Sequence, residues 1–147
     1  MEEILKKLNK DQRPIFDKMQ NSTLLNVCSP TGFGKGYIMM IDLYKRVLKS
    51  DEKIFAIATH RLLLNTQHMN DIIQRFKDEL SNLIFVFVGS QKYKMSNDSK
   101  SILRKNRITE TELIKNVTNN EKLKLLLEKY NDKKIINYNY YSSSSTI

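Results

Sequence analysis

Short runs of apolar residues alternate with longer segments of helical periodicity along the first 90 residues. The apolar runs 24–28, 53–59 and 83–88 have the length of buried strands. Between them, apolar residues recur with helical spacing over 37–48 and 62–80. The run 53–59 is apolar on both faces, as is usual for parallel strands covered by helices. Strand and helix alternating at this spacing predict a parallel α/β sheet with right-handed crossovers.

Helices are also predicted before the first strand. Residues 2–9 can form a short helix. Asp11 is a plausible N-cap for a second helix, because Pro14 then falls in the first turn, where its missing N–H matters little. Phe16 and Met19 would form the buried face of that second helix.

After Gln91 the chain becomes polar and basic, and we expect an exposed, loop-rich segment. Its cations are Lys92, Lys94, Lys100, Arg104, Lys105 and Arg107. Lys92 and Lys94 could extend a track of phosphate contacts, although lysines in an exposed loop are just as often only solvated.

Further on, residues 109–112 read as a capping box, Thr-Glu-Thr-Glu, that opens a helix through Leu113, Ile114 and Val117. Another helix is expected around 123–130, and 135–140 can form a fourth strand. The four serines near the C-terminus are typical of disorder.

Composition narrows the class of protein. A chain of 147 residues can bury about 68–70% of its unfolded surface and is expected to form one domain. The net charge of +9 suggests an anionic partner, most commonly nucleic acid; the alternative is a lysine-rich bias with solvated side chains. A single cysteine, Cys28, excludes a disulfide framework and a cysteine-based metal site. No signal-peptide core and no run near about 18 apolar residues occurs, so we expect a soluble intracellular protein without membrane contact.

The stretch Ser29–Gly36 has the composition of a phosphate-binding loop between a strand and a helix. Gly32 and Gly34 would let backbone N–H groups converge on phosphate oxygens, and Lys35 would reach the β- and γ-phosphates. Compared with G-x-x-x-x-G-K-[ST], Ser29 replaces the first glycine, and Gly36 replaces the hydroxyl residue that normally coordinates Mg²⁺. The alternative is a glycine-containing loop with a chance Gly-Lys pair.

Ligands of open parallel sheets bind at the carboxyl ends of the strands, so the loop 29–36 and the turns 59–61 and 89–91 should share one edge. Arg61 would stand just after a strand and at a helix start, where a guanidinium and N–H groups can both take a phosphate. It could also be an ordinary surface arginine. His60 is better explained as a packing or surface residue.

Taken together, these segments resemble the first half of the first RecA-like domain of superfamily 2 helicases, nearest to the DEAH-like and type III restriction-subunit-like branch. Lys10-Asp11-Gln12-Arg13-Pro14-Ile15 is similar to the segment whose glutamine reads adenine. Ser29-Pro30-Thr31-Gly32-Phe33-Gly34-Lys35-Gly36 resembles the P-T-G-x-G-K-T loop. The 58–67 segment resembles P-T-R-x-L-x-x-Q, and 139–143 resembles the strand-end T-Y-x-S.

The resemblance implies a RecA-like P-loop sheet that is incomplete at its C-terminal end. It divides residues 1–147 into a core with the nucleotide loop (1–90), a basic helical segment (91–134) and a strand with a serine-rich end (135–147). It also implies that ATP, as Mg-ATP, is bound by Gln12, Pro30, Thr31, Gly32, Phe33, Gly34, Lys35 and Gly36. Nucleic acid, DNA in preference to RNA, would contact Thr59, Arg61, Gln67, Ser90, Tyr141 and Ser142.

Hydrolysis in this superfamily needs a D-E-x-x pair at the end of a strand, and the sequence has none. Asp78-Glu79 ends a predicted helix, and Asp51-Glu52 precedes a strand. The second RecA-like domain with its arginine finger is also absent. We therefore expect no ATP turnover by this polypeptide alone, and a separate chain could supply the rest of a helicase.

The alternatives are a catalytically silent module that binds nucleic acid or a protein, and a small P-loop nucleotide kinase. The kinase is disfavoured because no arginine-rich lid is recognisable in the sequence.

Overall fold

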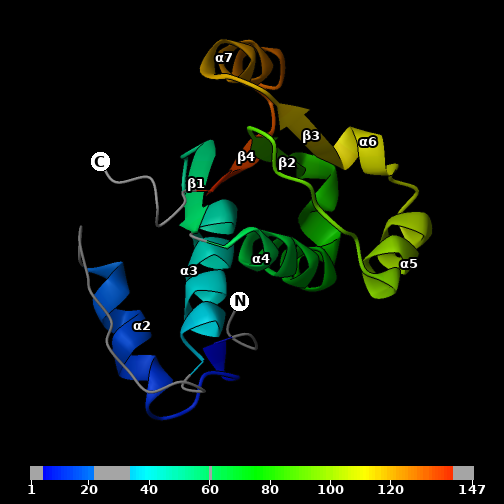
Figure 1. Cartoon of the computed structure of the whole chain (residues 1–147). Helices are drawn as coiled ribbons and strands as arrows, with labels where there is room; N and C mark the ends of the chain where they lie inside the picture. The colour runs from blue at the N-terminus through cyan, green and yellow to red at the C-terminus, as the bar shows by residue number, and fades with distance from the viewer. Residues whose placement is uncertain (1–4, 22–33, 60, 141–147) are drawn as a thin grey trace. The chain divides into compact units, whose positions relative to one another are not determined.

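The computed structural model describes residues 5–21, 34–59 and 61–140. The chain divides into two units, Met1–Asp51 and Glu52–Ile147 (Figure 1). The predicted strand 24–28 lies outside the described residues, as do residues 29–33 of the predicted loop. None of the described helices has the length and apolarity needed to cross a bilayer.

The first unit contains two helices, α2 (Gln12–Gln20) and α3 (Lys35–Lys49). They share an apolar cluster whose buried members are Leu8, Phe16, Ile38 and Ile41, with Met19 packed against it. The predicted buried face of α2 and the predicted helix over 37–48 are thus confirmed. A polar contact adds to the packing, because the Gln20 amide donates to Asp42 Oδ1 at 2.8 Å.

The prediction that Asp11 caps α2 was wrong for its side chain. Asp11 holds the N-cap position, but its backbone is helical and its side chain makes no capping bond. Instead, Oδ1 of Asn9 accepts hydrogen bonds from the N–H groups of Asp11 (2.9 Å) and Gln12 (2.8 Å). Because Arg13 N already bonds to Asn9 O, at 3.0 Å, the helical turn begins before Asp11, so the side chain of Asn9 caps it.

The second unit is built on four parallel strands in the order β1-β4-β2-β3. The strands are β1 (Ile54–Thr59), β2 (Leu83–Val88), β3 (Ile114–Val117) and β4 (Lys134–Tyr140). The helices are α4 (Leu62–Arg75), the 3₁₀ helix η1 (Lys77–Asn82), α5 (Asn97–Lys105), α6 (Glu110–Leu113) and α7 (Asn120–Lys129). The predicted parallel α/β fold is therefore confirmed.

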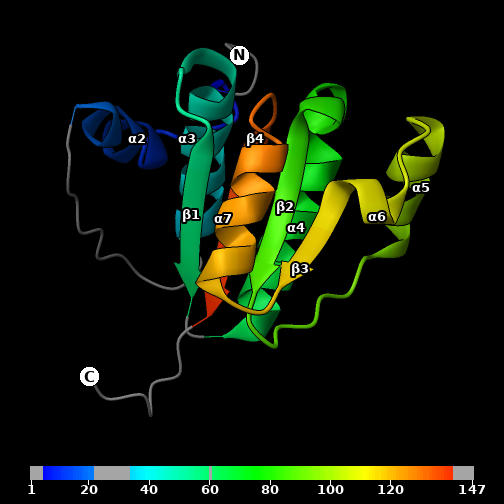
Figure 2. The same cartoon turned by 90° about the horizontal axis from the view of Figure 1, so that it is seen from above.

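Helices cover both faces of this sheet, with α4 on one face and α7 on the other (Figures 1 and 2). On the α7 face, Ile84, Val86, Val117 and Ile135 form a buried cluster against leucines of α7. On the α4 face, Tyr138 stacks on Phe85 and Phe87. The central strand β2 is buried on both faces, which explains its uninterrupted apolar sequence.

β1 was expected to be apolar and covered on both faces. Phe55 is buried, but Ile54 on the opposite face is 49% exposed. β1 pairs with β4 along one side and is the outermost strand of the described sheet on that side.

The predicted helix over 62–80 is two elements. α4 ends at Arg75, and η1 carries the chain to β2. Leu63 and Leu64, expected on the buried face, are 64% and 39% exposed, whereas Asn65 and Thr66 are buried.

The segment after Gln91 is less loop-rich than expected, because it contains α5. The hydroxyl of Ser96 caps this helix by accepting from Ser99 N at 3.2 Å. Of the predicted capping box, the bond from Glu112 N to the Thr109 hydroxyl is present at the start of α6, but this helix ends at Leu113. Ile114 and Val117 belong to β3 instead of a helix, because pairing with β2 outweighs the local helix signal.

Candidate functional site

The described end of the phosphate-binding loop is the start of α3. Gly34 has the left-handed backbone (φ +88°) that favours glycine, and its carbonyl accepts the first helical bond, from Ile38 N at 3.1 Å. The N–H groups of Lys35, Gly36 and Tyr37 therefore precede the helical ladder, at the positive end of the helix dipole. The first turn contains no acidic residue. Such a helix start suits an anion.

Gln12 lies against this helix start. Its side chain is buried, with 7% exposed, and Oε1 accepts from Asn9 N at 3.1 Å. Nε2 occupies the space into which a side chain at position 34 would project, so a β-carbon on Gly34 would collide with it. The structure thus places the predicted adenine-reading glutamine against Gly34, the first described residue of the predicted phosphate loop.

Gly36, the departure from the usual loop pattern, is exposed at the second position of α3. A β-carbon there would meet no atom of the described residues within 4 Å, so these residues leave space for the start of a side chain at this position.

In the second unit, a buried polar network ties together the carboxyl ends of the strands. The amide nitrogen of Asn65 donates to Gln91 Oε1 at 2.8 Å and to the carbonyl of Asn139, at the end of β4, at 3.0 Å. The amide nitrogen of Gln91 donates to the carbonyls of Val88 (2.7 Å) and Tyr138 (2.8 Å). Asn65 is fully buried and Gln91 is 4% exposed, so these amides replace water at the sheet edge.

The same network reaches β1 and β3. Oγ1 of Thr59 lies 2.9 Å from both Asn65 Oδ1 and Arg61 O. The amide of Asn116 donates to the Gln91 carbonyl at 3.0 Å. The turns after β1 and β2 therefore share one edge, as expected. That the loop 29–36 joins them stays a prediction.

Comparison with known proteins identifies the family. The family model described as type III restriction enzyme, res subunit, matches residues 1–141. The chain belongs to this family. No curated protein and no solved structure matches it. The suspected relationship to helicase-like restriction subunits is therefore confirmed for nearly the whole chain.

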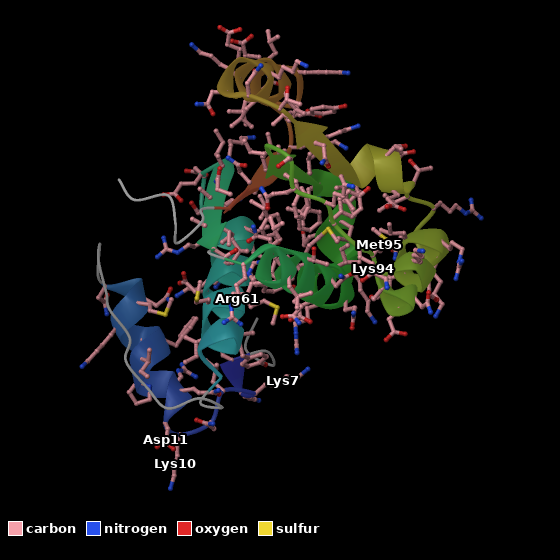
Figure 3. The ribbon with its side chains drawn as sticks, viewed as in Figure 1. Lys7, Lys10, Asp11, Arg61, Lys94 and Met95 are labelled. Carbon is pink, nitrogen blue, oxygen red and sulfur yellow. The ribbon has the colours of Figure 1, made fainter. Side chains whose placement is uncertain are left out.

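In this res-subunit chain, the predicted nucleic-acid residues have different surroundings. Arg61 is exposed, directly before α4 (Figure 3). Ser90 is exposed after Gly89, which has a positive φ of +84°. Gln67 is exposed on α4. Thr59 is engaged in the polar network, so its hydroxyl also has a structural role.

Other predicted residues of the res-subunit site lie outside the described residues. They are Pro30, Thr31, Gly32, Phe33, Tyr141 and Ser142, and His60 lies outside as well. Across the described ranges, no group of three His, Cys, Asp or Glu side chains is placed to hold a metal ion.

Sequence reasoning missed Asn65 and Gln91. Asn65 stands one helical turn before the buried Met69 and two turns before Ile72, so it occupies an apolar position of α4. A polar residue at such a position signals a buried hydrogen bond. Gln91 carried no comparable signal, because it lies in a loop and its partners include the Asn65 side chain and the Tyr138 carbonyl, both distant in sequence.

Beneath this edge, His68 Nδ1 lies 2.7 Å from the hydroxyl of the fully buried Tyr138. Burial lowers the pKa of His68 from 6.5 to about 4, so the imidazole is neutral at pH 7. Burial raises the pKa of Tyr138, and the charge of Asp71 adds to that rise. His68 and Tyr138 therefore form a neutral pair that links α4 to the central part of the sheet.

Proposed function

We propose that this chain is the ATP- and nucleic-acid-binding portion of a superfamily 2 DNA helicase of the restriction-subunit type. The observation that carries the proposal is the position of Gln12 against Gly34. The contact brings the proposed adenine-reading residue and the phosphate-binding helix start to the same part of the first unit. Residues 1–147 then act as one partial RecA-like domain.

In this proposal the first turn of α3 holds the phosphates through backbone N–H groups, and Lys35 adds a positive charge. An amide can pair with the N6 and N7 atoms of adenine, because it offers one donor and one acceptor group. Oε1 of Gln12 accepts from Asn9 N, so the side chain is held in place at the start of its own helix.

The carboxyl edge of the sheet is the proposed nucleic-acid surface. Arg61 and Ser90 are exposed there, and the Asn65–Gln91 network fixes the turns that present them. Gln67, Tyr141 and Ser142 complete the proposed contacts. Phosphate contacts of this kind position a strand without reading its sequence.

Hydrolysis is not part of the proposal for this polypeptide alone. Gly36 offers no hydroxyl to Mg²⁺, and neither Asp-Glu pair of the described residues, Asp51-Glu52 before β1 and Asp78-Glu79 in η1, follows the end of a strand. An arginine finger alone contributes about 10³–10⁵ in rate in related phosphoryl-transfer enzymes. Those groups would have to come from outside these residues.

Two titrations test the proposal. A fluorescent ATP analogue should bind the wild-type chain, and Gln12→Ala and Lys35→Ala should each weaken it. Labelled single-stranded DNA should bind with an affinity that falls steeply with salt and is reduced by Arg61→Gln. Phosphate release should stay at background with or without DNA. DNA-stimulated release that Lys35→Ala abolishes would contradict the proposed inactivity.

A second candidate is a silent nucleic-acid- or protein-binding module, which is favoured by Gly36 at the hydroxyl position. The two candidates differ in whether ATP binding and DNA binding affect each other. In a nucleotide-dependent binder, ATP shifts the affinity for DNA, whereas in a silent module the DNA affinity is the same with and without ATP.

A further inference from the structure

Much of the positive charge of the chain is concentrated around α5. Residues 91–108 contain six lysines and arginines and a single acidic residue, Asp98. Two of the cations, Lys100 and Arg104, lie one turn apart on α5, and Arg107 follows beyond the end of the helix. All three are exposed. We call these three residues the basic stripe.

The opposite side of α5 fixes the helix to the second unit. Ser99 and Leu103 are buried, and so is Met95 at the entry to the helix (Figure 3). The side chain of Asn70 on α4 clamps that entry, donating to Lys94 O at 2.9 Å and accepting from Ser96 N at 3.0 Å. The basic stripe therefore belongs to a helix that is anchored beside the sheet edge formed by β3 (Figure 2).

These cations are not neutralised within the described part of the chain. The ion pairs Arg13–Asp17 and Arg46–Asp42 do not involve α5. Arg104 lies in the last turn of α5, where a cation interacts favourably with the helix dipole, so this charge does not disfavour the helix.

Arg107 adds a second observation. It follows α5 in the left-handed conformation (φ +57°), where glycine is favoured. The backbone around it forms a Schellman motif, because Ile108 N bonds to Leu103 O at 3.0 Å and Arg107 N to Arg104 O at 3.2 Å. Here an arginine holds a glycine position and extends the stripe beyond the helix end.

We propose that the basic stripe binds the phosphate backbone of duplex DNA, as a second contact surface beside the carboxyl edge of the sheet. Lys100 and Arg104 lie about 6 Å apart along the axis of α5, and Arg107 follows beyond its end, so the three cations can contact more than one phosphate. α5 contains no aromatic residue on which an unpaired base could stack. A duplex offers phosphates at fixed spacing, which matches rigidly held cations. This inference rests on the proposed nucleic-acid binding and names the form of DNA that α5 contacts.

The test compares three full-length proteins at several salt concentrations. They are the wild type, the stripe variant Lys100→Gln/Arg104→Gln/Arg107→Gln, and a control, Lys6→Gln/Lys7→Gln/Lys124→Gln, which loses the same charge from other exposed positions. Glutamine keeps helix propensity close to that of lysine and arginine. Circular dichroism and melting temperature verify that both variants fold. Each protein is titrated with a labelled duplex and with a labelled single strand.

The stripe variant should bind the duplex about ten- to a hundredfold more weakly, and its slope of log affinity against log salt should fall by about 2–3. The control should stay within about threefold of wild type. Single-strand binding should change far less in the stripe variant than in Arg61→Gln.

Equal duplex binding by the stripe variant and the control would overturn the inference while leaving the proposed function intact. Competition by polyglutamate as effective as that by DNA would overturn it too, since the stripe would then serve an acidic protein. A wild-type chain that binds neither form of DNA would overturn the proposed function along with it.

Discussion

The amide nitrogen of Gln12 occupies the space where a β-carbon on Gly34 would lie. The two residues belong to different helices of the first unit, and Gly34 can come this close because it has no side chain. The contact therefore requires glycine for two reasons. A side chain at position 34 would block the approach of Gln12, and the positive φ of +88° favours glycine.

Gly34→Ala should destabilise the first unit and weaken ATP binding. The left-handed backbone costs an alanine about 1–2 kcal/mol, and the collision with Gln12 adds to that cost. In a Gln12→Ala background the collision disappears, while the backbone strain remains. Urea denaturation of both single variants and the double variant should give a coupling of about 0.5–3 kcal/mol, with the double variant more stable than additivity predicts.

Gly36→Ala is the matched control, because the β-carbon there enters open space inside a helix. It should stabilise the chain by about 0.5–1 kcal/mol. Additive losses in the Gly34 cycle would show that the two side chains do not compete for the same space.

Gly36→Thr should make nucleotide binding depend on magnesium. The new hydroxyl stands where P-loop proteins coordinate Mg²⁺, and the surrounding space admits it. We expect Mg²⁺ to tighten ATP binding at least severalfold in this variant, measured by calorimetry with and without the metal. Gly36→Val, which has the same shape without the hydroxyl, should gain nothing. An equal Mg²⁺ effect in both variants would assign it to something other than coordination.

Patterns with strong periodicity were readable from sequence alone. β2 was predicted with its observed ends, since an apolar run buried on both faces leaves little alternative. The paired strand β3 was not predicted, because the capping box at Thr109 gave a local helix signal that pairing with β2 overrides four residues later. α5 was missed because its many charges suggested a loop, although Ser96 and Asp98 are typical of a helix start.

The sequence predicted more of the candidate site in the first unit than in the second. Gln12 and the loop follow each other in the order found in the resembling helicases, so the resemblance predicted that they are close. The Asn65–Gln91 network depends on contacts 26 residues apart and on carbonyls of β4, which no local pattern encodes.

Asn65→Leu should destabilise the second unit by about 2–4 kcal/mol, because it leaves the Gln91 and Asn139 oxygens buried without their donor. Leucine branches at the same carbon and is larger than asparagine, so a cavity is not the cause. The same substitution at the exposed Asn131 should stay within about 0.5 kcal/mol. Denaturant midpoints give the change in the free energy of unfolding for both variants. Equal changes at the two positions would show that the network does not contribute to stability.

Acid should weaken the second unit through His68. Its pKa is about 4 in the folded chain and near 6.5 when unfolded, so the unfolded state binds more protons between these values. The contribution is fully present above pH 6.5 and is lost as the pH falls toward 4, amounting to about 2 kcal/mol by pH 5. His68→Gln should flatten the pH dependence of the urea midpoint between pH 7 and 5, where few carboxylates titrate. A variant with the wild-type slope would show that His68 is not the group responsible.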